Sequence, residues 1–345
     1  MRKLATVRNI SDIKPIPGAD LIELAIVDGW QCVIKKDTLS VGEMVIYCEV
    51  DSVLPIHPEY EYLRKSCYVQ KDWLPNGEGF RLRTIKLKKQ VSQGLLLPLS
   101  AAYGLDDSKP IYGEDVSDAL GIIKWEPPIP ANLSGLVKGN FPSYIPKTDQ
   151  ERVQNLTREV FHDNPDTLWE VTLKLDGSSC TFYHKDGEVG VCSRNMNLKL
   201  EQTGNAFVDM FHRLVLAEKL LEYGNIAVQG ELMGPKIQGN REGFSDYAFY
   251  AYDIWDIDRQ QYLPSNQRNA ILDRLGLGLV PVLELSTTLA GIGCTTISDM
   301  LEYVERPSIN HKVAEGVVFK NVHGSDCDSL YSFKCISNTY LLGEK

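Results

Sequence analysis

The sequence lacks any apolar run long enough to span a lipid bilayer, and its first residues, Met1–Val7, contain no hydrophobic signal-peptide core. We therefore expect a soluble, intracellular (cytoplasmic) protein with no membrane partner. Basic residues are also in the minority, because 46 Asp and Glu outnumber 36 Lys and Arg and leave a net charge of −10. This balance argues against a protein that coats nucleic acid with its whole surface. A local basic groove is still compatible with it, because counterion release depends on local contacts.

Paired cysteines are missing too. The eight cysteines are scattered, with no CxxC pair and no Cys/His cluster at the spacing of zinc ligands. The simplest interpretation is a set of reduced, buried thiols in a reducing compartment. With 345 residues, of which 43% are hydrophobic, the chain is long enough for two domains that each bury a core.

Residues 1–115 consist of short β-branched runs separated by turn residues. Asp28-Gly29 predicts a hairpin that joins strands over Leu21–Val27 and Trp30–Ile34, and Gly42–Val50 predicts another strand. About five strands at this spacing, with few helices, indicate a small closed β-barrel of the OB type. We therefore expect an OB-like, nucleic-acid-binding first domain.

One predicted strand of this domain, over residues 80–89, is strongly basic. It carries Arg81, Arg83, Lys86 and Lys88. Such a strand is either a charged edge that guards against aggregation or a surface that contacts phosphates of nucleic acid, and the two interpretations have similar weight. A basic strand in an otherwise acidic chain favours the second, so these four residues are the predicted nucleic-acid contacts.

Prolines then mark a change of domain. Residues 116–147 contain five prolines and several aromatic residues, which predicts an irregular connector packed on the next domain. A helix is expected to follow, running through Asn155 with Thr148 or Asp149 as its N-cap. Residues 148–345 mix helices with mainly antiparallel strands, which predicts an α+β domain. Its predicted helices cover 204–221, 265–275 and 298–303, and its strands include 226–233, 247–255, 315–320 and 331–336.

Within that second domain, the stretch Val171–Ser179 leads an apolar β-branched run into Lys174 and then into an Asp176-Gly177 turn. Taken alone, such a lysine is more often a solvated surface charge. An arginine, a strand glutamate, an aromatic strand, a Glu-Gly strand that ends in a lysine and then another lysine follow in order: Arg194, Glu231, Tyr252, Glu315, Lys320 and Lys334. Each group is a weak signal by itself, but the ordered set is what a lysine nucleophile that attacks a nucleotide would need.

This ordered set resembles the covalent nucleotidyltransferase superfamily, which contains ATP-dependent polynucleotide ligases and mRNA capping enzymes. The run Asp-Gly-Ser-Ser that ends at Ser179 and the upstream stretch Pro146–Asn155 are similar to RNA ligases. An OB-like domain that precedes the nucleotidyltransferase domain is similar to the RNA ligases of the Deinococcus and Naegleria type. One departure is Ser332, which stands where the last motif often has a lysine.

The resemblance implies an ATP-dependent RNA ligase that joins 3′-OH and 5′-phosphate ends, at nicks in RNA-containing duplexes, through lysyl-AMP on Lys174 and an AMP-capped 5′ end. A DNA ligase or a GTP-using capping enzyme of the same superfamily is the alternative. The Ser-Ser pair and the order of the domains argue against it. A nucleic-acid-binding protein that has lost catalysis is a third interpretation, against which the retained lysine and carboxylates count. We expect a monomer.

The resemblance also implies roles for individual residues. Lys320 and Lys334 are expected at the α-phosphate, and Asp176, Glu231 and Glu315 are expected to hold a hydrated Mg²⁺ or Mn²⁺. The remaining ATP contacts are expected from Thr172, Leu173, Arg194, Glu231, Tyr252 and Arg152. Tyr252 would stack on adenine, with Phe249 and Tyr250 as alternates. For Arg152, the alternative is a solvated arginine on a helix. Ser178 and Ser179 are expected either to contact ribose, phosphate or nucleic acid, or only to cap the Asp176-Gly177 turn. Attack by a neutral amine leads us to expect a lowered pKa for Lys174, caused by the metal and by the cations nearby.

Overall fold

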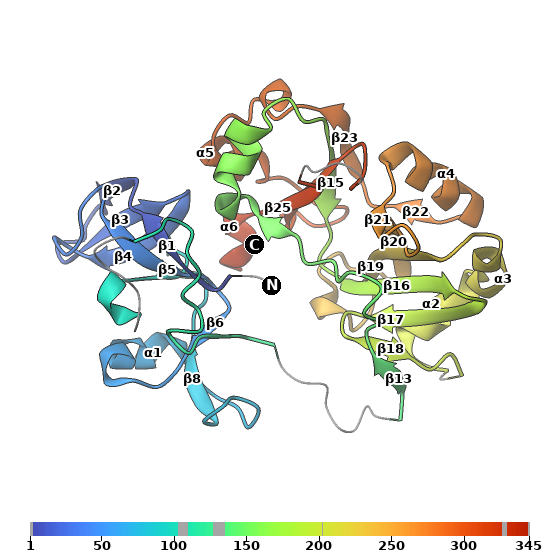
Figure 1. Ribbon diagram of the computed structural model, residues 1–345, viewed down its shortest axis with the longest axis horizontal. Helices are drawn as coiled ribbons and strands as arrows, with labels where there is room; N and C mark the ends of the chain where they lie inside the picture. Colours follow the sequence, from blue (N-terminus) through green and yellow to red (C-terminus); the bar gives the residue numbers. More distant parts are fainter. Residues whose placement is uncertain (1–2, 103–109, 127–134, 202, 326–329, 344–345) are drawn as a thin grey trace. The chain divides into compact units, whose positions relative to one another are not determined.

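The computed structural model describes residues 3–102, 110–126, 135–201, 203–325 and 330–343, and the chain divides into two compact units, Met1–Pro128 and Ile129–Lys345 (Figure 1). The predicted connector is split between them. Val116, Leu120 and Ile122 are buried in the core of the first unit, whereas Tyr144 and Ile145 pack in the second. The first unit extends past residue 115 because the Ser117 hydroxyl accepts the backbone N–H groups of residues 4 and 5.

The first unit is built from short strands in four antiparallel sheets, with strand orders β1-β5-β11, β9-β10, β12-β6-β8-β7 and β2-β3-β4. A 3₁₀ turn, Pro58–Leu63, leads into its short helix α1 (Arg64–Cys67). The predicted hairpin at Asp28-Gly29 is present as β3 and β4. The strands are β1 (Ala5–Asn9), β2 (Asp12–Pro15), β3 (Ile22–Val27), β4 (Trp30–Lys35), β5 (Met44–Cys48), β6 (Ser52–Leu54), β7 (Tyr68–Gln70), β8 (Glu78–Arg81), β9 (Ile85–Leu87), β10 (Gln90–Ser92), β11 (Leu95–Leu97) and β12 (Ile123–Lys124).

The predicted single basic strand over residues 80–89 is wrong. Strand β8 ends at Arg81, and β9 begins only at Ile85. Lys88 and Lys89 both have positive φ values and form the turn that joins β9 to β10. Arg81 is half-buried, with its Nη2 2.7 Å from an Asp51 oxygen, whereas Arg83, Lys86 and Lys88 are exposed. A backbone that turns at this point cannot present the four charges as one row.

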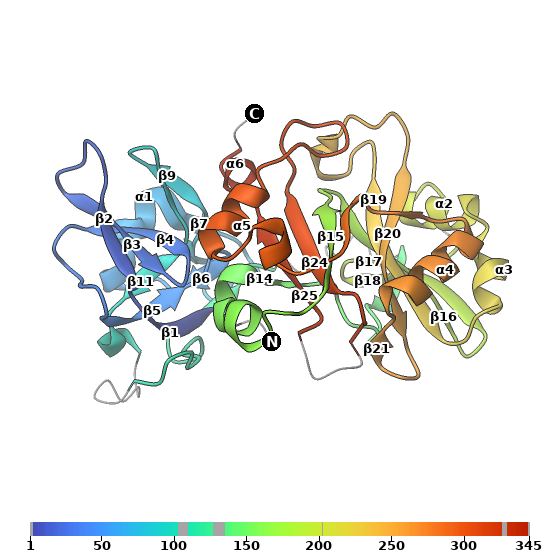
Figure 2. The same ribbon diagram turned by 90° about the horizontal axis from the view of Figure 1, so that it is seen from above.

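The second unit contains an eight-stranded sheet in the order β13-β18-β17-β16-β19-β20-β21, with β22 added to β20. Helices α2, α3 and α4 cover one of its faces and share a hydrophobic core with it (Figures 1 and 2). The predicted helix over 204–221 is two helices, α2 and α3, because Val215 between them has a left-handed φ of 53°. The elements are β13 (Val137–Asn140), β16 (Ser178–Lys185), β17 (Glu188–Ser193), β18 (Met196–Leu198), α2 (Ala206–Arg213), α3 (Leu216–Leu221), β19 (Ile226–Met233), β20 (Ala248–Asp256), β21 (Gln261–Tyr262), α4 (Ser265–Leu275) and β22 (Gly278–Leu279).

A five-stranded sheet in the order β14-β25-β24-β15-β23 completes the second unit, and α5 packs on it (Figure 2). Its elements are β14 (Glu151–Arg152), β15 (Trp169–Lys174), β23 (Val282–Thr287), α5 (Ile297–Tyr303), β24 (Gly316–Asn321), β25 (Ser332–Ile336) and α6 (Asn338–Leu341). The predicted helix through Asn155 is wrong, because Glu151 and Arg152 instead pair in parallel with Phe333 and Lys334 at the sheet edge. A 3₁₀ turn, Val153–Asn155, follows, and a π-helical turn covers Glu159–Asp163.

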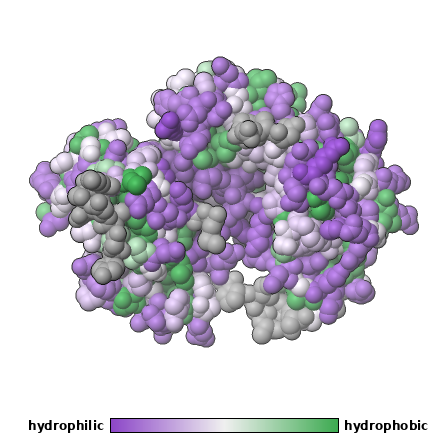
Figure 3. All heavy atoms as spheres, in the orientation of Figure 1, coloured by the Kyte–Doolittle hydropathy of each residue, from purple (hydrophilic) through white to green (hydrophobic). Residues whose placement is uncertain are grey.

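The surface shown in Figure 3 is mostly hydrophilic, with hydrophobic residues scattered over it in small groups. Among the helices that the structure describes, none combines the length and the apolar character that crossing a membrane requires.

Candidate active site

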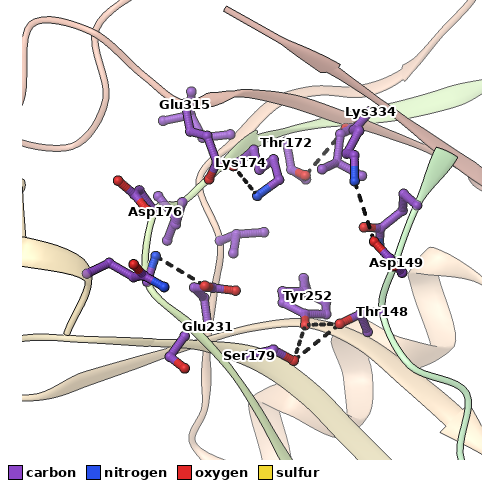
Figure 4. Close-up of a pocket in the computed structure, with 18 of the residues that line it drawn as sticks. Thr148, Asp149, Thr172, Lys174, Asp176, Ser179, Glu231, Tyr252, Glu315 and Lys334 are labelled. Carbon is purple, nitrogen blue, oxygen red and sulfur yellow. Dashed lines mark hydrogen bonds and ion pairs between the residues drawn. The ribbon is translucent and has the colours of Figure 1, made fainter. Parts of the chain in front are cut away.

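A pocket of about 280 Å³ lies between the two sheets of the second unit (Figure 4). It brings together twelve of the predicted site residues: Thr172, Leu173, Lys174, Asp176, Ser178, Ser179, Arg194, Glu231, Tyr252, Glu315, Lys320 and Lys334. Arg152 does not line it and lies on β14, where it pairs with Lys334 across the backbone. Arg81, Arg83, Lys86 and Lys88 belong to the other unit.

Lys174 is the last residue of β15, whose first five residues are all buried. The Asp176-Gly177 turn then starts β16, so the amine is presented at the end of a rigid strand. A Cβ atom at Gly177 would lie 2.5 Å from the carbonyl oxygen of Leu232 and 2.8 Å from Cγ of Glu231. The turn therefore requires glycine, and it packs β16 closely against the strand that carries Glu231.

Three carboxylates surround the Lys174 amine on one side of the pocket (Figure 4). Its Nζ lies 2.6 Å from Oε1 of Glu315, and its side chain is 24% exposed. Burial lowers the pKa of Lys174, but Glu315, Glu231 and Asp176 together outweigh burial and leave the pKa raised. Without a bound metal ion, the protein therefore does not lower the pKa of Lys174, because the carboxylates outweigh the effect of burial on the amine.

The carboxylates also act on one another. Burial raises the pKa of Glu231 to about 8, and the charges of Glu315 and Asp176 add to this rise, while Lys174 and the Gly177 N–H oppose it. Burial and Glu315 raise the pKa of Asp176 as well. Over the described ranges of the chain, no three Asp, Glu, His or Cys side chains converge closely enough to coordinate a metal ion directly. The three carboxylates therefore crowd one another without forming a preformed metal cage.

Tyr252 enters the pocket at a β-bulge. Gly230 pairs with Ala251 and Gln229 pairs with Asp253, so Tyr252 is the extra residue of β20. The bulge lets both Tyr252 and Asp253 reach Lys320, whose Nζ lies 5.0 Å from the Tyr252 ring centroid and 3.0 Å from the Asp253 carboxylate.

The two alternates for adenine stacking lie elsewhere. Phe249 is buried in the core on the helical side of the sheet, and Tyr250 packs against Phe244. Neither lines the pocket.

The two predicted phosphate-binding lysines differ in their surroundings. Lys320 is 1% exposed, donates to the Tyr252 carbonyl oxygen at 2.6 Å, and has its pKa lowered by burial. Lys334 is more accessible, and its Nζ lies 3.7 Å from the Asp149 carboxylate, which is also 3.9 Å from Arg194. Lys334 and Arg194 therefore meet around one anionic group, whereas Lys320 is held beneath the Tyr252 ring.

Residues 141–150 form a strap across the larger sheet that the sequence analysis did not assign to the site. Carbonyl oxygens of Tyr144 and Pro146 accept hydrogen bonds from Trp255 and Gln229, which lays the strap over the strands. The Tyr252 hydroxyl then donates to Thr148 at 2.9 Å, and the Ser179 hydroxyl lies 3.2 Å from Thr148. The resemblance of Pro146–Asn155 to RNA ligases was the signal that could have placed Thr148 and Asp149 in the pocket.

A buried ion pair supports this arrangement from behind. Arg268 on α4 and Glu170 on β15 are both 1% exposed, and Nη2 of Arg268 lies 2.6 Å from a Glu170 oxygen. Nη1 of Arg268 donates to the Tyr252 carbonyl oxygen at 3.3 Å. Strand β15, which ends at Lys174, and the bulge of β20 are therefore joined through one side chain.

Comparison with known proteins gives matches to both units. An OB-fold domain matches residues 4–99, and an RNA ligase domain matches residues 167–336. No curated protein sequence matches the chain.

Among solved structures, a mutant of Naegleria gruberi RNA ligase with AMP and Mn is 42% identical, with a TM-score of 0.86 over 99% of this chain and 98% of that one. The same ligase with PPi is 42% identical, with a TM-score of 0.85 over 99% and 98%. A mutant with ATP and Mn is 41% identical, with a TM-score of 0.86 over 98% of each chain.

Proposed function

The chain belongs to the RNA ligase family, and on that premise we propose that it uses ATP to seal nicks in RNA-containing duplexes through a covalent lysyl-AMP on Lys174. The predicted fold, an N-terminal OB domain followed by a ligase domain, is confirmed by the two family matches. The observation that carries the proposal is the Lys174 amine at the end of β15, facing a pocket that also contains Tyr252, Lys334 and Arg194.

Nucleotide binding would use the two sides of the pocket differently. Adenine would stack on Tyr252, whose hydroxyl is anchored by Thr148, while the phosphates would lie toward Lys334 and Arg194. The phosphates would compete with Asp149 for these two cations, because Asp149 is the anion that holds them in the protein alone. Positioning of this kind supplies most of the catalysis that a protein can give to phosphoryl transfer.

Covalent attachment is then a single displacement. Nζ of Lys174 forms a bond to the α-phosphorus, and the bond from that phosphorus to the pyrophosphate oxygen breaks. The amine must first lose a proton, which the surrounding carboxylates oppose by raising its pKa. Neutralising the negative charge of Glu315, Glu231 and Asp176 would remove this opposition.

A divalent cation fits this need. Mg²⁺ and Mn²⁺ prefer oxygen ligands, and the pocket offers three crowded carboxylates, of which Glu231 has its pKa raised to about 8 by burial. Asp176, Glu231 and Glu315 would hold the ion, largely through its water ligands, since they do not form a direct coordination cage. When bound, the ion would supply the positive charge that lets Lys174 lose its proton.

The two later steps would follow family chemistry. AMP passes from Lys174 to the 5′-phosphate of a nick, and the 3′-hydroxyl then displaces AMP to form the phosphodiester bond. We propose that Ser179 and the exposed Arg83, Lys86 and Lys88 contact the nucleic acid. Arg81 is a weaker candidate, because Asp51 already holds its guanidinium.

Labelling tests the first step. Protein incubated with α-³²P-ATP and Mg²⁺ or Mn²⁺ is expected to become labelled, whereas Lys174→Ala is expected to stay unlabelled. Lys199→Ala, which removes an exposed lysine outside the pocket, should be labelled like the wild type. Equal label on Lys174→Ala would refute the nucleophile.

Sealing assays test the substrate. Nicked duplexes with RNA on the 3′-OH side should be sealed faster than nicks in which both strands are DNA. Equal rates on the two substrates would contradict the preference for RNA.

A further inference from the structure

The short helix α6, close to the end of the described chain, is tied directly to the pocket. Its N-cap Ser337 donates its backbone N–H to the carbonyl oxygen of Glu315 at 3.0 Å. The Glu305 carboxylate accepts from the Ser337 hydroxyl and from the Asn338 N–H, each at 2.9 Å. The helix therefore begins at a fixed point, because Ser337 is hydrogen-bonded to the backbone of Glu315, and the Glu315 carboxylate contacts Lys174.

This anchoring brings Tyr340 into the pocket wall, next to Asp176. Tyr340 also acts on the Asp176 side chain, because it opposes the rise in the pKa of that carboxylate that burial and Glu315 cause. The guanidinium of Arg241 lies over the Tyr340 ring, 4.6 Å from its centroid, and its Nη1 is 3.9 Å from Oδ2 of Asp176. Arg241 thus links the Asp176 carboxylate to the Tyr340 ring, although the three residues come from separate segments.

Such an arrangement restricts the orientation of the Asp176 carboxylate. Nη1 of Arg241 approaches one oxygen of the carboxylate and Tyr340 acts on the same group, which leaves its other lone pairs available to a ligand in the pocket. The guanidinium over the ring is a favourable cation–π contact and keeps the Tyr340 ring in place. Partners of this kind behind a metal-binding carboxylate commonly change metal affinity or activity 10–100-fold when they are lost.

We propose that Tyr340 and Arg241 are positioning residues that hold the Asp176 carboxylate for the divalent cation, so that helix α6 completes the metal-binding side of the active site. The inference rests on the proposed function, because it assigns Asp176 to that cation. It concerns residues that neither the sequence motifs nor the family resemblance assigned to the site.

Tyr340→Phe is the sharpest variant, because it removes the hydroxyl and keeps the ring under Arg241. Tyr303→Phe is a matched control, since Tyr303 also carries an arginine over its ring, with Arg306 4.0 Å from the centroid, but does not line the pocket. Arg241→Met tests the second residue, because it retains an unbranched stem over Tyr340 and loses the charge.

Calorimetry measures the binding of Mn²⁺ to the full chain, which is first saturated with the non-cleavable ATP analogue α,β-methylene-ATP. The dissociation constant for Mn²⁺ is expected to rise about 10-fold in Tyr340→Phe and in Arg241→Met, and to be unchanged in Tyr303→Phe. In the labelling assay, the Mn²⁺ concentration for half-maximal labelling should rise by the same factor, while the rate at saturating Mn²⁺ stays near that of the wild type.

Wild-type affinity in Tyr340→Phe would overturn the role of the hydroxyl, and wild-type affinity in Arg241→Met would overturn that of the guanidinium. An equal loss in Tyr303→Phe, or no Mn²⁺ binding by the wild type, would overturn the inference as a whole. Failure of the proposed function looks different: Lys174 would not be labelled even though Mn²⁺ binding still depended on the Tyr340 hydroxyl.

Discussion

At the scale of single residues, the protein by itself holds Lys174 and Glu231 in the opposite protonation states from those that the proposed mechanism needs. Lys174 keeps its proton because the Glu315 carboxylate, 2.6 Å from the amine, stabilises the ammonium. Glu231 keeps its proton because burial raises its pKa to about 8. Both groups would release protons when positive charge enters the pocket, so the proposed mechanism couples cation binding to the deprotonation of Lys174 by electrostatics.

The raised pKa of Glu231 predicts a pH dependence of stability. The folded protein binds this proton up to about pH 8, whereas an ordinary glutamate loses it near 4.5, so the folded state holds more protons between these values. The free energy of unfolding should therefore fall as the pH rises through that window. In EDTA, the melting temperature of the wild type should fall from pH 5 to pH 8.5 more steeply than that of Glu231→Gln.

The matched control for this comparison is Glu218→Gln, which changes an exposed glutamate on α3. It should follow the wild-type curve. Parallel curves for the wild type and Glu231→Gln would show that Glu231 ionises normally.

At the scale of secondary structure, two irregularities shape the pocket. The bulge in β20 places Tyr252 beside Lys320, and the tight turn at Gly177 sets the distance between β16 and β19. Both are points at which a regular strand would have turned a functional side chain away from the pocket.

Gly177→Ala tests the second irregularity. The added methyl would lie within 2.8 Å of Glu231 and Leu232 atoms, so the turn must shift and the hydrogen bond from the Gly177 N–H to Glu231 must lengthen. We expect a loss of about 1–3 kcal/mol in the free energy of unfolding, as for other overpacked sites, together with slower labelling of Lys174. Denaturant unfolding and the labelling assay measure the two effects.

Gly278→Ala provides the comparison, because a Cβ there meets nothing within 4 Å. It should leave stability and labelling nearly unchanged. If Gly177→Ala behaves in the same way, the turn does not depend on glycine.

At the scale of the whole molecule, the two units have separate roles in the proposal. All the groups that would act on ATP belong to the second unit, whereas the exposed basic residues Arg83, Lys86 and Lys88 belong to the first. A protein with a net charge of −10 needs such a local basic surface in order to bind a polyanion.

The triple variant Arg83→Ala, Lys86→Ala, Lys88→Ala should therefore separate substrate binding from chemistry. Labelling of Lys174 by ATP should be unchanged, while affinity for a nicked RNA duplex falls and its dependence on salt becomes shallower by up to about 0.9 per lost phosphate contact. Titration of the duplex at several salt concentrations measures both.

A second triple variant removes the same charge from exposed positions elsewhere in the first unit: Lys14→Ala, Lys35→Ala and Lys36→Ala. It should keep the wild-type salt dependence. An identical loss in both triple variants would mean that only net charge matters.

The order of chemical groups along the chain was determined by the sequence, and with it the family and the positions of the main strands. Strand β19 and helix α4 have the predicted bounds, because each depends on a local pattern of apolar residues and turn signals. Lys174, Glu231, Tyr252 and Glu315 could be found because each stands in a short motif at the end or in the middle of such a strand.

Only the tertiary structure decided which distant groups meet. Thr148, Ser179 and Tyr252 share hydrogen bonds although they are up to 104 residues apart, and Tyr340 reaches Asp176 from the other end of the domain. The same is true of the protonation of Lys174, since a pKa depends on distances to charges and on burial, which the order of residues does not contain. The basic strand of the first unit failed as a prediction for a related reason: alternating charges indicate a strand, but the turn at Lys88 and the ion pair of Arg81 depend on how the chain packs.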